Sequence, residues 1–148
     1  SGVLSGLTRV RSLTQDDCHI FCTPKQVKSE FTLSLELVKE EMEVFGLDLR
    51  VALSLPGREG KYVEAPERWE EAIAVLRHAM QESGLEFTEE EGEAAFYGPK
   101  ADFFALDALG REWQLSTIQV DLIQPERLGC TYIGEERSER RQTISAWC

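Results

Sequence analysis

The sequence has little cysteine, few basic residues and no long apolar run. No apolar stretch approaches the roughly 18 residues that predict a membrane-spanning helix. The first residues lack the basic segment and apolar stretch of a signal peptide. The cysteines are Cys18, Cys22, Cys130 and Cys148, with no CxxC spacing among them. This argues against a zinc ribbon and a disulfide framework, so we expect reduced thiols in a cytoplasmic protein with no membrane partner.

Basic residues are outnumbered by acidic ones, 16 to 27, which gives a net charge of −11. A free-standing nucleic-acid-binding domain needs a basic face to neutralise phosphates, so this balance argues against one but leaves room for a local basic site. The length of 148 residues and the hydrophobic content of 42% are typical of a single globular domain.

Two stretches have the period of amphipathic helices. The first begins with Thr23 as N-cap, Pro24 at the first position and Gln26 completing a capping box, and Gly46 ends it. The second begins at Pro66 and ends at Gly84. Their expected apolar faces consist of Val27, Phe31, Leu35, Val38, Met42 and Phe45, and of Trp69, Ile73, Leu76 and Met80.

Alternating or β-rich segments predict strands at residues 49–55, 101–107, 112–123 and 131–133. The short connection at 108–111 makes the second and third of these antiparallel neighbours. Residues 89–91, three consecutive glutamates, are expected to form a solvated acidic loop. Helices with antiparallel strands predict an α+β domain.

Polar residues recur every second position in the segment that leads into residue 22. Gln15, Asp17 and His19 would share one face of a strand. Together they suit a small ligand that carries an amine and a hydroxyl, because such groups are costly to bury without partners. The alternative is a polar strand whose groups satisfy one another, and the spacing alone does not choose between the two.

Two further segments are candidates for a binding site. The Gly98-Pro99 turn would present Tyr97 and Lys100 from a stiff platform, with the glycine letting backbone approach a ligand; the alternative is a plain turn with a surface lysine. On the strand that follows, polar residues share one face, and Gln114 would need a β-bulge to join them. These residues are Thr117, Gln119 and Asp121.

The segments GLTRVR…TQDDCHIFCT (6–23), AFYGPK (95–100) and QLSTIQVD (114–121) together resemble the threonyl-tRNA synthetases. The resemblance covers residues 4–134 and leaves 135–148 unassigned. It implies that residues 1–148 form part of a class II aminoacyl-tRNA synthetase catalytic domain, an incomplete antiparallel sheet flanked by helices.

The resemblance also implies roles for individual residues. Arg9 and Lys100 match catalytic positions, and Arg9 meets the outer phosphates of ATP, which suits its fork of donors. Leu13 stands where the family usually has a phenylalanine that stacks on adenine. The threonine-binding positions are Gln15, Asp17, Tyr97 and Gln119, and the ATP-binding positions are Arg9, Leu13, Gln114 and Thr117.

His19 matches one ligand of the family's zinc, which holds the amine and hydroxyl of threonine. The family's other two ligands are a cysteine upstream and a histidine downstream, so the Zn²⁺ site is incomplete in this chain. The second histidine, His78, lies in the second expected helix and is read as a surface residue. For the full enzyme, the resemblance implies threonine, Mg-ATP and tRNA(Thr) as substrates, a homodimer and a cytoplasmic location.

The sequence leaves two functions open. The chain is part of a threonine–tRNA ligase and is inactive alone, because phosphate-binding arginines of the family lie outside it. Alternatively, it is a truncated, non-catalytic paralogue that binds an amino acid, a nucleotide or a protein.

Overall fold

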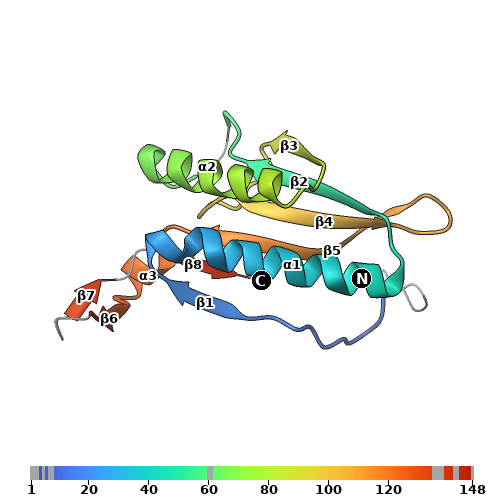
Figure 1. The fold of residues 1–148 in the computed structure, drawn as a ribbon, viewed down its shortest axis with the longest axis horizontal. Coiled ribbons are helices and arrows are strands. Elements are labelled where there is room, and N and C mark those ends of the chain that lie inside the picture. The colour runs from blue at the N-terminus through green and yellow to red at the C-terminus, as the bar shows by residue number, and fades with distance from the viewer. Residues whose placement is uncertain are drawn as a thin grey trace.

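A computed structural model describes residues 4, 6, 9–59 and 62–134, together with the backbone of 139–141 and 144–147. It confirms the α+β class (Figure 1). The elements in chain order are β1 (His19–Cys22), the 3₁₀ helix η1 (Pro24–Gln26), α1 (Val27–Phe45), β2 (Leu49–Leu55), α2 (Pro66–Glu82), β3 (Phe87–Glu91), β4 (Lys100–Leu106), β5 (Glu112–Asp121), α3 (Gln124–Arg127), β6 (Thr131–Ile133), β7 (Glu139–Arg141) and β8 (Ile144–Trp147).

The main sheet has six strands in the order β1-β8-β5-β4-β2-β3, and β6 and β7 form a separate hairpin. The expected β4–β5 neighbours are antiparallel, as is every other pair in the sheet except β2 and β3. These two are parallel because α2 crosses over between them. The expected antiparallel sheet is therefore present, with one parallel pair at the β2–β3 edge.

The expected acidic loop at residues 89–91 is also wrong, because these residues lie in β3. Charged residues are tolerated on an edge strand with one solvated side. Glu90 accepts a 2.7 Å hydrogen bond from Arg50 of β2, and Glu89 accepts one of 2.6 Å from Arg77 of α2. The glutamates therefore tie the edge strand to its neighbours.

Both expected helices are present, and their ends follow the sequence signals. The Gln26 side chain accepts a 3.0 Å hydrogen bond from the Thr23 backbone, as a capping box requires. Gly46 ends α1 with φ +63°, a conformation that favours glycine. Phe45 was expected on the buried face but is 72% exposed. Periodicity predicts which way a side chain points, but burial also requires packing partners, and Phe45, unlike Met42, is not part of the core cluster.

The helices α1 and α2 lie side by side on one face of the sheet, with α1 over β5 and β8 and α2 over β2 (Figure 1). Leu76 and Met80 of α2 are fully buried. Trp69 is also buried, and its indole N–H donates a 3.0 Å hydrogen bond to the Val63 carbonyl. The largest fully buried side chains from α1 and the sheet include Phe31, Leu35, Leu53, Phe103 and Ile118.

Part of the unassigned tail occupies a central place in the fold. Residues 144–147 form β8, which lies between β1 and β5; residues 135–138, 142, 143 and 148 lie outside the described part. His19 and Gln119 both pair in register with Trp147, one from each side. The segment that precedes β1 is thus held beside β5 through β8.

Among the described residues, none of the helices is both long enough and apolar enough to pass through a membrane.

Candidate functional site

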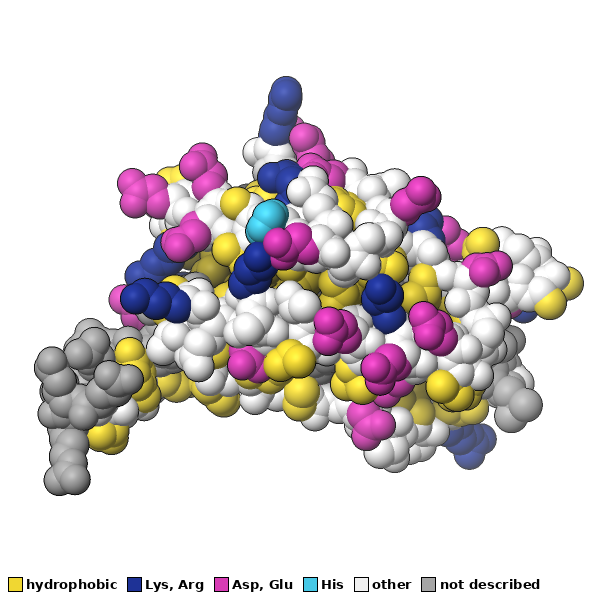
Figure 2. All heavy atoms as spheres, viewed as in Figure 1, with side chains coloured by type: hydrophobic (Ala, Val, Ile, Leu, Met, Phe, Trp, Pro, Cys, Tyr) yellow, Lys and Arg dark blue, Asp and Glu magenta, His cyan; other side chains and the backbone are white. Residues whose placement is uncertain are grey.

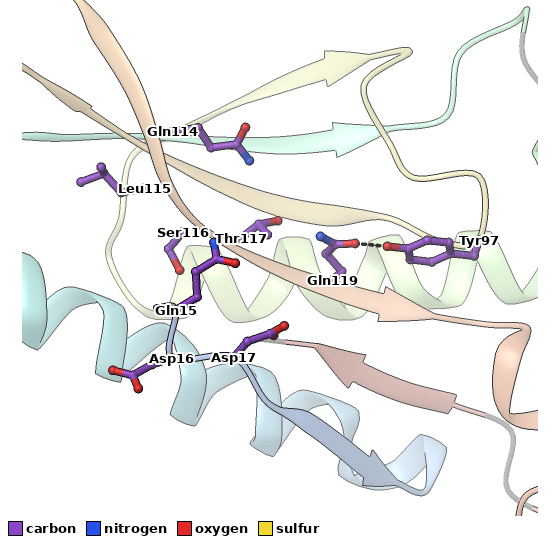
Figure 3. A pocket seen from close by; sticks show the side chains of 9 residues that line it. All are labelled: Gln15, Asp16, Asp17, Tyr97, Gln114, Leu115, Ser116, Thr117 and Gln119. Carbon is purple, nitrogen blue, oxygen red and sulfur yellow. Dashed lines mark hydrogen bonds between the residues drawn. The ribbon is translucent and has the colours of Figure 1, made fainter. Parts of the chain in front are cut away.

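A cavity of about 430 Å³ lies between the segment that precedes β1 and the polar face of β5 (Figure 3). Its wall contains two carboxylates, three side-chain amides and three hydroxyls, with a single apolar side chain. The lining residues are Gln15, Asp16, Asp17, Tyr97, Gln114, Leu115, Ser116, Thr117 and Gln119.

The expected strand over residues 15–18 is wrong, because β1 begins only at His19 and residues 12–18 are not part of a strand, although Gln15 and Asp17 do line the same cavity. Both Asp16 and Asp17 line the cavity, with the carboxylate of Asp17 directed toward Gln119 and that of Asp16 directed away from it (Figure 3). His19 is exposed and does not belong to the wall. The wall therefore also includes Asp16, which the sequence analysis had not singled out.

The expected bulge in β5 is confirmed. Phe103 pairs with Ser116 and Phe104 pairs with Gln114, so Leu115 is the extra residue. This shift brings Gln114 to the same wall as Thr117 and Gln119. It also brings in Leu115 and Ser116, which no sequence signal had singled out.

The 97–100 turn is held by backbone contacts with β5 and the residue that follows it. A Cβ at Gly98 would lie 1.7 Å from the Val120 carbonyl oxygen. On either side of it, Leu122 donates a 3.1 Å hydrogen bond to the Tyr97 carbonyl, and Val120 donates one of 3.1 Å to that of Pro99. Gly98 allows a close backbone approach, as expected, but the group that it approaches is the backbone of β5 at Val120.

Tyr97 crosses the end of the cavity and donates its hydroxyl hydrogen bond to the carboxamide oxygen of Gln119 (Figure 3). Burial, and secondarily the negative charge of Asp121, raise the pKa of the Tyr97 hydroxyl. The phenol therefore remains a neutral hydrogen-bonding group at neutral pH. The contact joins two residues that the sequence analysis assigned to threonine binding.

The wall brings together Gln15, Asp17, Tyr97, Gln114, Thr117 and Gln119 but omits other expected site residues. Arg9 and Leu13 are exposed outside it. Lys100 turns its ammonium toward Asp102, with 2.7 Å between Nζ and Oδ2. His78 is exposed on α2, as expected, and lies 3.2 Å from Glu82.

The described lining residues carry carboxylates but neither lysine nor arginine. Such a wall attracts an ammonium group and offers donors and acceptors to a hydroxyl, while phosphates need cations from outside it. On the face that carries α1 and α2, acidic and basic side chains are interspersed without a continuous basic patch (Figure 2). Because its described wall residues carry carboxylates and no lysine or arginine, the cavity suits the amino-acid end of a ligand.

Comparison with known proteins identifies the surrounding fold. The family model of the class II tRNA synthetase core domain (G, H, P, S and T) matches residues 1–146. The chain belongs to this family. The match extends the resemblance beyond residue 134 and includes most of β8.

Two curated relatives of this class II core are threonine–tRNA ligases. The protein from Rubrobacter xylanophilus is 59% identical over 138 residues, which are 92% of this chain and 22% of that protein. The protein from Thermus thermophilus is 52% identical over 146 residues, again 22% of its length. The chain therefore spans about a fifth of the curated relatives it matches.

A solved structure shares the architecture. It is the RNA-binding domain of the threonyl-tRNA synthetase from Cryptosporidium parvum, with a TM-score of 0.85 and 37% identity. The alignment covers 98% of this chain and 36% of that one. The expected class II synthetase fold is thus confirmed, with β3 as its parallel edge.

Proposed function

We propose that this class II core is part of a threonine–tRNA ligase and that its cavity holds threonine. One observation carries the proposal: Gln15 and Asp17 face Tyr97 and Gln119 across one polar cavity (Figure 3). These are the four positions for which the family resemblance implies threonine binding. The similarity to threonine–tRNA ligases over nearly the whole chain supports the same reading.

The wall matches the chemistry of threonine. The carboxylate of Asp17 can accept a hydrogen bond from the substrate hydroxyl, and the acidic pair Asp16–Asp17 favours its ammonium group. A polar pocket built around a hydroxyl rejects an isostere that lacks one, because its own polar groups are then left unpaired. Valine is the relevant competitor.

In the proposed reaction, the threonine carboxylate attacks the α-phosphate of Mg-ATP, which forms threonyl-adenylate and releases pyrophosphate. The threonyl group then passes to tRNA(Thr). Such chemistry depends mainly on positioning and on stabilising phosphate charge. Arg9 is the proposed phosphate contact and Leu13 the proposed adenine contact, both just upstream of the cavity. We further propose that the full enzyme is a cytoplasmic homodimer.

The described residues do not form a zinc site by themselves, because they contain no group of three or more histidine, cysteine or acidic side chains able to hold a metal ion. His19 would supply one ligand, and the others would come from elsewhere in the full-length protein.

The threonine assignment is tested by calorimetric titration of the chain with L-threonine and with the sulfamoyl analogue of threonyl-adenylate. Asp17→Asn should weaken binding of the analogue about tenfold or more, because a charge-assisted hydrogen bond is lost. Asp48→Asn removes the same charge from an exposed residue that does not line the cavity, and it should leave affinity unchanged. Equal affinity for the threonyl and valyl analogues would contradict the proposal.

A pyrophosphate-exchange assay separates the remaining alternatives. The 148-residue chain should show only background exchange, and activity above background would overturn the proposal that it is inactive alone. Threonine binding without exchange in the full-length protein would instead favour the non-catalytic binding module.

A further inference from the structure

Asp102 of β4 is a buried carboxylate with three donors from three strands. It is only 3% exposed. Its Oδ2 lies 2.7 Å from the Ser54 hydroxyl and 2.7 Å from the Lys100 ammonium. Its Oδ1 accepts a 2.8 Å hydrogen bond from the side-chain nitrogen of Gln114. A buried charge is costly unless it is paired and hydrogen-bonded, and here both oxygens are satisfied.

The position of these groups follows from the strand pairing. Lys100 and Asp102 are two residues apart on β4 and therefore share a face, opposite to the buried Ala101 and Phe103. Gln114 reaches the same carboxylate because the bulge at Leu115 shifts the register of β5. The sheet thus places the Asp102 carboxylate between two side chains. One is the amide of Gln114, which lines the cavity, and the other is the ammonium of Lys100, a residue that pairs in register with Gln119.

We propose that Asp102 is a positioning residue that fixes the Gln114 carboxamide and the Lys100 ammonium beside the cavity. The hydrogen bond to Asp102 engages one of the two N–H groups of the Gln114 carboxamide and fixes its orientation. The second N–H and the carbonyl oxygen remain available, so Gln114 can present a donor and an acceptor in fixed positions to a ligand. The assignment rests on the proposed function only for the identity of that ligand.

The ligand-binding test uses Asp102→Asn, which keeps the side-chain volume but removes the charge and turns an acceptor into a donor. It should weaken binding of the sulfamoyl adenylate analogue about tenfold or more, because one carboxylate oxygen is replaced by an NH₂ group that cannot accept a hydrogen bond, so either Gln114 or Lys100 loses its partner. Ser54→Ala is the matched control, since it removes a hydrogen bond to the same carboxylate without altering Lys100 or Gln114. It should change the affinity by less than about threefold.

A double variant separates positioning from a general structural effect. If Asp102 acts through Gln114 and Lys100, then Asp102→Asn should add little to the loss already caused by Gln114→Ala together with Lys100→Met. If Asp102→Asn weakens binding by the same factor in that background as in the unaltered chain, the proposal is overturned, because Asp102 then acts independently of both side chains.

A measurement without ligand or substitution keeps this inference distinct from the proposed function. In the unaltered chain, the side-chain NH₂ protons of Gln114 should exchange with water about tenfold or more slowly than those of the exposed Gln81. Equal rates would overturn the positioning role even if Asp102→Asn fails to fold. Slow exchange without binding of the adenylate analogue would count against the proposed function alone.

Discussion

Gly98 packs against the backbone of β5 at a point where a side chain has no room. Gly98→Ala would place a methyl group 1.7 Å from the Val120 carbonyl oxygen. Because that oxygen belongs to the backbone of a buried strand, we expect a loss of about 3 kcal/mol or more in the free energy of unfolding, measured by urea denaturation.

Gly110→Ala provides the matched control for that substitution. Gly110 has φ +74° but open space around its missing Cβ, so the cost should be near the conformational penalty of about 1 kcal/mol. Equal losses for the two variants would mean that the contact with Val120 does not constrain the turn.

Asp107 organises the turn between β4 and β5. Its Oδ1 accepts hydrogen bonds of 2.9 Å from the backbone of Leu109 and of Arg111, and its Oδ2 accepts one of 3.0 Å from the Trp113 indole. The hydrogen bond from Trp113, followed by those from Arg111, holds the pKa of Asp107 well below its usual value. The carboxylate form is therefore favoured by folding.

This pKa shift predicts a pH dependence of a definite sign. A depressed pKa contributes stability above the unfolded-state pKa, and the contribution is lost as the pH falls through the folded-state pKa. The stability difference between the unaltered chain and Asp107→Asn should thus be full at neutral pH and shrink below about pH 4. Urea titrations at several pH values measure it, with Asp48→Asn as the charge-matched control. A difference that does not change with pH would contradict the assignment.

Strand β8 determines whether the segment before β1 stays beside β5. In the described sheet, β1 is paired only with β8. Removing residues 142–148 should make the backbone amides of β1 exchange about tenfold or more faster, while those of β2 and β4 remain protected by their mutual pairing. Unchanged protection at residues 19–22 in hydrogen-exchange mass spectrometry would show that β1 is held by other contacts.

The helices and the β4–β5 hairpin could be read from local signals, because each is set by periodicity and by residues at its ends. Gly46 ends α1, and the Asp107 turn joins the two strands. The edge strand β3 was missed because three consecutive glutamates read as a solvated loop. Their partners Arg50 and Arg77 lie 40 and 12 residues away from them in sequence, so no local pattern could show the pairing.

The chain spans about a fifth of the length of the curated relatives it matches. The described residues hold no group of three potential metal ligands, so His19 would need ligands from outside them. We expect the purified chain to contain well below one zinc per molecule by elemental analysis. Stable stoichiometric zinc would mean that the chain supplies a complete ligand set. Full-length protein, prepared in parallel, is the comparison.

The sequence by itself determined the family, the two main helices, the hairpin and most of the polar residues of the cavity, because these depend on motifs and on contacts between near neighbours. The need for a bulge was also readable, since the parity of Gln114 differs from that of Thr117. Only the tertiary structure decided that Asp16 joins the cavity, that β8 separates β1 from β5, and that Asp102 links Lys100 to Gln114. Each of these depends on strand order or on irregular backbone, which are set by the packing of distant segments and not by the period of any one of them.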